Sequence, residues 1–137
     1  MRHCSFCLFN FWAILVAALI QWVLGALWYS LLFRKPWMAL VGRKSDGKPK
    51  GMAVGMISSF IGGLLLAFIL AHIVYWANAW TWHRGAFLGF ICWLGFIAVP
   101  LSAEHQYEGR PFKLFAINAG YWLLALVVTG VVLAVWR

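Results

Sequence analysis

Four long apolar stretches, separated by short segments that hold nearly every charged residue, constrain the fold of this chain most strongly. A helix of about 20 residues rises about 30 Å, which matches the thickness of the hydrocarbon core of a bilayer. The sequence therefore predicts four membrane-spanning helices in a single membrane domain, residues 1–137. The predicted spans cover residues 9–32, 54–76, 85–102 and 115–136, and a basic loop covers residues 33–53.

The composition supports a membrane protein over a soluble one. Hydrophobic residues make up 65% of the chain and charged residues only 10%, whereas soluble domains carry about 25% charged residues. A soluble domain of this size cannot enclose so much apolar surface. Backbone inside lipid must form its own hydrogen bonds, as a helix or a closed barrel, and continuous rather than alternating apolar runs exclude the barrel. We expect an all-α, four-transmembrane-helix bundle.

Two similar turns raise the question of internal repetition. One contains Lys35-Pro36-Trp37 and the other Arg110-Pro111-Phe112, each a basic residue, a proline and an aromatic residue. The pair favours an arrangement of two parallel helical hairpins, of the kind found in some transporters. Because proline and basic residues are common in such turns, two unrelated hairpins remain an open alternative.

The basic residues are distributed unequally between the two sides of the membrane. Four crossings place both termini on one side, with three basic residues, and the connecting turns with eight on the other. The three are Arg2, Arg84 and Arg137; the eight are Arg34, Lys35, Arg43, Lys44, Lys48, Lys50, Arg110 and Lys113. Short cytoplasmic loops are enriched in Lys and Arg. We therefore expect a cell (inner) membrane protein with a cytoplasmic basic loop and both termini outside the cytoplasm.

The net charge of +8 could also indicate a binding partner. Its confinement to the membrane edges argues against nucleic acid and makes the lipid bilayer the expected partner. Residues 34–50 would suit anionic lipid headgroups, which attract Lys and Arg close to the membrane. A role in fixing the topology alone explains the same residues.

The second predicted span carries a small residue at every fourth position. The residues of this small-residue stripe are Gly51, Gly55, Ser59, Gly63, Ala67 and Ala71. Helices in lipid associate through close backbone contact at small residues, so we expect the stripe to pack against other helices of the bundle. A seam between two copies, in a homo-oligomer, is the alternative. Shorter versions occur at Gly85/Gly89 and Ala116/Gly120.

Polar side chains are few within the predicted spans. They include Gln21, Ser58, Ser59, His72, Asn118 and Thr129, and no span contains Asp, Glu, Lys or Arg. Proton- and ion-coupled carriers normally need an ionisable group inside the membrane. The sequence therefore argues against a carrier of that kind.

Two groups of residues resemble metal or redox sites without matching one. Cys4 and Cys7 supply too few ligands for a structural zinc site and lack the context of a redox pair, and a disulfide between them stays open. Glu104, His105 and Glu108 are chemically sensible ligands, but a solvated loop explains them as well. We predict no catalytic residue, no cofactor and no metal site, and hence no enzyme.

Two motifs in this order resemble a known family. The first comprises Gly25-Ala26-Leu27-Trp28-Tyr29-Ser30, Leu32-Phe33 and Lys35-Pro36-Trp37-Met38; the second comprises Glu108-Gly109-Arg110-Pro111, Lys113-Leu114-Phe115 and Ile117-Asn118-Ala119-Gly120-Tyr121. The chain resembles, from Asn10 to Trp136, the bacterial membrane family known as domain of unknown function 1761. The resemblance implies a small multi-pass inner-membrane protein with no established activity. Leu31 departs from the proline that the family usually has there.

The expected topology brings polar residues together where the first span ends and the fourth begins. This candidate cytoplasmic-face polar cluster comprises Tyr29, Ser30, Glu108, Arg110, Asn118 and Tyr121. These residues could form a site, or merely fix helix ends at the interface. For function, we expect a non-enzymatic accessory or structural membrane protein, in a homo-oligomer or a larger membrane complex. A small transporter or channel built from paired helical hairpins is the alternative.

Overall fold

A computed structural model describes residues 10–32, 35–36, 39 and 52–136 of the chain. It contains four helical segments that are long and apolar enough to cross a membrane. The predicted all-α bundle of four transmembrane helices is confirmed, and the chain is an integral membrane protein. Gly51, Cys4, Cys7 and the basic stretch at 40–50 lie outside the described residues.

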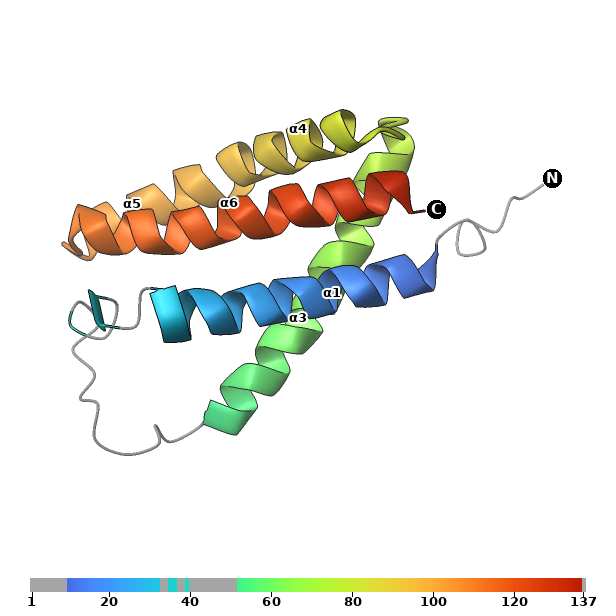
Figure 1. Ribbon diagram of the computed structural model, residues 1–137. Coiled ribbons are helices and arrows are strands. Elements are labelled where there is room, and N and C mark those ends of the chain that lie inside the picture. The colour runs from blue at the N-terminus through green and yellow to red at the C-terminus, as the bar shows by residue number, and fades with distance from the viewer. Residues whose placement is uncertain (1–9, 33–34, 37–38, 40–51, 137) are drawn as a thin grey trace.

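The helical segments follow one another in a simple order (Figure 1). The first is α1 (Phe11–Leu27), continued by a π-helical stretch, η2 (Trp28–Leu32); the second is α3 (Met52–Trp76). The third consists of α4 (Trp82–Trp93), the π-helical η3 (Leu94–Ala98) and α5 (Val99–Tyr107), and the fourth is α6 (Phe112–Val135). The start of α1 and the end of α6 lie at the same end of the bundle. We call the opposite end, where α1 stops and α6 starts, the basic end.

Asn10 fixes where the first helix begins. Its side-chain oxygen accepts hydrogen bonds from the backbone N–H groups of Trp12 and Ala13, at 3.1 and 3.4 Å. The first N–H groups of a helix have no partner within the helix, and Asn is among the best residues at supplying one.

The third membrane-spanning segment is longer than the sequence predicts. It runs from Trp82 to Tyr107 rather than from 85 to 102. Proline lacks the N–H group of a helical hydrogen bond, and its ring clashes with the carbonyl four residues earlier. Here Pro100 follows η3, and the wider turn of a π-helix changes the local hydrogen-bond pattern. The helix therefore continues through Pro100 for about two further turns.

Glycines bring α4 and α6 into close backbone contact. A Cβ atom on Gly85 would overlap the Gly130 carbonyl oxygen and lie 2.6 Å from the Ala134 Cβ, and one on Gly89 would lie 2.7 Å from the Leu126 carbonyl carbon. Figure 1 shows the two helices side by side. This contact resembles the small-residue packing common between membrane helices. The two helical hairpins therefore differ from each other. In the second hairpin α4 lies alongside α6, whereas in the first hairpin α3 crosses the bundle obliquely.

The two halves of α3 have different surroundings. Its second half contributes Ala67, Leu70 and Val74 to the core, where each is at most 3% exposed. Its first half, from 53 to 59, is exposed throughout. The small-residue stripe is divided in the same way, because Ala67 and Ala71 are buried whereas Gly55 and Ser59 are exposed. The oblique course of α3 leaves most of its first half uncovered by the other described helices.

Candidate functional site: a polar cavity between three helices

Hydrogen bonds link the first membrane-spanning segment, α1 and η2, to α6 near the basic end. The Tyr29 hydroxyl donates to the Asn118 side-chain oxygen at 2.9 Å, and the Tyr121 hydroxyl donates to the backbone carbonyl of Gln21 at 3.1 Å. The rings of Tyr29 and Tyr121 meet edge to face, with centroids 5.5 Å apart. The Trp28 indole also donates to the Ile117 carbonyl, at 3.1 Å. Three residues of the candidate polar cluster thus lie together.

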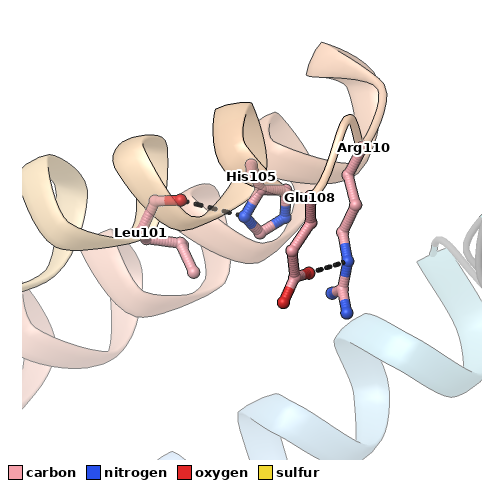
Figure 2. A network of polar contacts seen from close by, with 4 residues as sticks. All are labelled: Leu101, His105, Glu108 and Arg110. Atoms are coloured by element: carbon pink, nitrogen blue, oxygen red, sulfur yellow. Dashed lines mark hydrogen bonds and ion pairs between the residues drawn. The ribbon is translucent and has the colours of Figure 1, made fainter.

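The other three residues of the candidate polar cluster lie elsewhere. Ser30 is exposed on η2. Glu108 and Arg110 form an ion pair with each other in the turn between α5 and α6, where their side chains are 42% and 48% exposed (Figure 2). Water screens an ion pair of this kind, so it contributes about 0–1 kcal/mol.

Helical periodicity explains which α1 residues face Tyr121. Gln21, Gly25 and Tyr29 are spaced by four residues and therefore share one face of the first membrane-spanning segment, formed by α1 and η2. A Cβ atom on Gly25 would lie 3.1 Å from the Tyr121 hydroxyl oxygen. The missing side chain at Gly25 leaves room for the Tyr121 ring. Tyr121 can then reach the backbone of α1 at Gln21.

A second hydrogen bond joins α1 and α6 deep in the bundle. The Gln21 side-chain nitrogen donates to the Thr129 hydroxyl oxygen at 2.8 Å. Gln21 is 3% exposed and Thr129 is fully buried. Both residues stand out in the sequence as polar groups within predicted spans. Their hydrogen bond cannot be predicted from the sequence, because 108 positions separate the two residues and no local sequence pattern connects them.

These residues form one wall of a cavity of about 600 Å³ between α1, α3 and α6. We call it the α1–α3–α6 cavity. Its lining comprises Ala18, Gln21, Trp22 and Gly25 of α1, Tyr29 of η2, Ser58, Ser59, Gly62 and Gly63 of α3, and Tyr121 and Trp122 of α6. It extends from the middle of α1, at Gln21, to the last turns of that span, at Tyr29. Ligand-binding cavities typically measure about 300–1,000 Å³.

The course of α3 creates this cavity. Gly63 still lies close to α1, because a Cβ atom there would be 3.5 Å from the Gln21 side-chain oxygen. Toward the basic end, an added Cβ on Gly55 would meet nothing within 4 Å. The Trp22 side chain connects α1 to α3. Its indole N–H donates to the Met56 carbonyl at 3.3 Å, and its ring contacts that of Phe60. The roles of Trp22, Gly25 and Gly62 in this cavity could not be predicted from the sequence, because no local signal reveals them.

The chemistry available in the cavity is hydrogen bonding. Its lining holds amide, hydroxyl and indole groups, and no Asp, Glu, Lys, Arg, His or Cys occurs among these described residues. A charge near the bilayer centre costs about 2.5–3.5 kcal/mol on insertion scales. Stacking a cation on an aromatic ring returns about 0.5–2 kcal/mol. The aromatic rings in the wall therefore do not offset the cost of an ionised ligand.

His105 is the other notable polar residue near the basic end. It is 4% exposed, and its Nδ1 lies 2.9 Å from the Leu101 carbonyl oxygen (Figure 2). Its ring contacts that of Phe115. Its Nε2 has no hydrogen-bond partner within the described part of the chain. No three His, Cys, Asp or Glu side chains converge there as metal ligands either. The possible ligand set of Glu104, His105 and Glu108 is therefore not assembled.

Comparison with known proteins identifies a family. The model of the family described as "Protein of unknown function (DUF1761)" matches residues 12–134. No curated protein and no solved structure matches the chain. The matched region spans all eleven residues that line the α1–α3–α6 cavity. The chain therefore belongs to the family of unknown function DUF1761.

Proposed function

We propose that the protein is a small, non-enzymatic membrane carrier that binds its solute in the α1–α3–α6 cavity. The observation that supports this function is the buried side chain of Gln21, which lies in the wall of a cavity large enough for a ligand. Polar groups inside a membrane are costly and are most often functional. Of the two functions expected from the sequence, the cavity favours the transporter.

Thiol labelling tests whether the cavity admits molecules from water. Ser59→Cys lies in the cavity wall, whereas Ile61→Cys lies on the same helix outside that wall, at a position 59% exposed on the lipid-facing surface. Both substitutions are made in a chain with Cys4→Ser, Cys7→Ser and Cys92→Ala. Thiol reagents react with the thiolate form of cysteine, and an apolar environment suppresses the formation of the thiolate. We expect a small hydrophilic thiol reagent to label Ser59→Cys about ten-fold faster than Ile61→Cys.

The accessory or structural role remains the second candidate, on one observation. The first half of α3 presents Val54 and Ile57, 71% and 63% exposed, beside Gly55 and Ser59. A second copy or another membrane protein packed on this surface would cover positions 59 and 61 alike. Equal, slow labelling of both thiols, with a native mass above one chain in mild detergent, would contradict the carrier and support the accessory role.

We also propose that the basic end faces the cytoplasm, in the cell (inner) membrane. The support is the excess of Lys and Arg in the turns at that end, eight residues against three. Such residues also gain about 1 kcal/mol each near an anionic leaflet, which makes residues 34–50 a candidate contact for lipid headgroups. A reporter joined to Arg137 should then be active outside the cytosol, and activity inside it would reverse the orientation.

A further inference from the structure

The hydroxyl groups of the cavity already donate their hydrogens within the protein. Tyr121 donates to the Gln21 carbonyl at 3.1 Å. Ser58 and Ser59 both donate to the Gly55 carbonyl, at 3.0 and 2.7 Å. A hydroxyl group has one hydrogen and two lone pairs. These three oxygens therefore offer the cavity lone pairs, which accept hydrogen bonds.

Gln21 adds a fourth acceptor. Its amide nitrogen donates to Thr129, which fixes the orientation of the amide group. Its amide oxygen lies on the side of Gly63, 3.5 Å from where a Cβ atom of that glycine would be. Within the described residues this oxygen receives no hydrogen bond, although Gln21 is 3% exposed. The oxygen is not fully buried, because His105 Nε2 is the only fully buried side-chain nitrogen or oxygen without a hydrogen-bond partner among the described residues. Its lone pairs are therefore open to a ligand with a donor group.

The cavity combines these acceptors with aromatic rings and lacks a charge. Trp22, Tyr121 and Trp122 supply apolar surface beside the polar groups. An anionic ligand would meet oxygen lone pairs without a cation, and a cationic ligand would meet no carboxylate. An uncharged molecule with several N–H or O–H groups would gain hydrogen bonds without the cost of a buried charge.

We propose that the α1–α3–α6 cavity recognises uncharged molecules that combine two or more hydrogen-bond donors with an apolar group, as in a diol attached to a hydrocarbon. Ser59, Tyr121 and the Gln21 amide oxygen accept the donors, and the tryptophan rings contact the apolar part. This inference rests on the proposed carrier function and names its solute class. The diol can come from the bilayer, as a monoacylglycerol, or from water, as a soluble short-chain 1,2-alkanediol.

Equilibrium binding to the full-length protein in mild detergent tests the proposal. The probes are a radiolabelled monoacylglycerol, 1,2-hexanediol, and the fatty acid and alkyl amine of the same chain length as the monoacylglycerol. We expect the monoacylglycerol to bind at least ten-fold more tightly than the acid or the amine. Binding of 1,2-hexanediol as well would indicate a water-borne solute, and binding of the monoacylglycerol alone would indicate a lipid-borne one. Both results support the diol chemistry. Equal or tighter binding of the amine or the acid would overturn it.

Three variants test the acceptors. Tyr121→Phe keeps the ring and removes the hydroxyl, Ser59→Ala removes an exposed hydroxyl, and Gln21→Met removes the buried amide. Each should raise the Kd of the monoacylglycerol by about 2–10-fold, the effect of one hydrogen bond. Ser102→Ala is the control for Ser59→Ala, because Ser102 also donates to a backbone carbonyl of the preceding turn, that of Val99 at 3.0 Å, and lies outside the cavity. It should leave the Kd unchanged.

Two outcomes separate a failure of this proposal from a failure of the carrier function. Rapid labelling of Ser59→Cys together with no monoacylglycerol binding would overturn the ligand class and leave the carrier in place. No labelling at Ser59→Cys would overturn the carrier itself. If Gln21→Met does not yield folded protein, Ser59→Ala still tests the assigned acceptors. Ser59 lies on the exposed half of α3, where the substitution should not disturb folding. An unchanged Kd in Ser59→Ala and Tyr121→Phe would contradict the assigned acceptors.

Discussion

Replacing Gly89 by Ala should destabilise the protein by about 3 kcal/mol, near the upper end of the range for overpacked cores. The added methyl group would overlap the backbone of α6 at Leu126 and Val127. Neither backbone can move aside as a side chain would, so α4 and α6 must separate along their contact. Gly85→Ala should act in the same way against Gly130. Thermal unfolding of the purified protein in mild detergent, followed by loss of the monodisperse peak, measures the effect.

Gly95→Ala is the control for this prediction. Gly95 lies in the same membrane-spanning segment, but an added Cβ there would meet no atom within 4 Å. Its effect should stay within about 0.5 kcal/mol, as for most surface substitutions. If Gly89→Ala and Gly95→Ala unfolded at the same temperature, the close contact between α4 and α6 would be wrong.

Gly63→Leu should destabilise the protein by about 1–3 kcal/mol, whereas Gly55→Leu should change its stability by less than about 0.5 kcal/mol. A Cβ atom at 63 is already 3.5 Å from the Gln21 side-chain oxygen and 3.9 Å from the Ala18 carbonyl, so the rest of a leucine must displace α1 or fill the cavity. A Cβ atom at 55 meets nothing within 4 Å. The two glycines belong to the same stripe, and thermal unfolding in detergent compares them directly.

The comparison also separates two interpretations of the stripe. If the stripe packs only within one chain, only its second half makes contacts, and Gly63→Leu should be destabilised more than Gly55→Leu. A seam between two copies would use Gly55 as well, and Gly55→Leu would then lower the native mass in mild detergent from two chains to one. If the two leucine variants were equally stable and neither changed the native mass in mild detergent, both interpretations of the stripe would be contradicted.

The candidate site was only partly accessible from the sequence. Tyr29, Asn118 and Tyr121 could be placed near one another because four crossings bring the end of one span to the start of another. That argument gives the membrane depth of a residue and not its direction around the helix. Glu108 and Ser30 lie at the same end as Tyr29, yet Ser30 is exposed and Glu108 pairs with Arg110. Rotation and tilt of the helices decide which residues at one depth meet.

The sequence by itself determined the class of the protein and the number of spans. Apolar length and the exclusion of charge depend only on the solvent, and the bilayer imposes the same requirement on every helix. Only the tertiary structure decided that α4 and α6 pack backbone to backbone while α3 diverges, and that Gln21 meets Thr129 beside a cavity. Between apolar helices in lipid no hydrophobic force selects neighbours, so these choices depend on shape and on a few hydrogen bonds. Such complementarity joins residues far apart in the chain, and it exists only once the helices are in place.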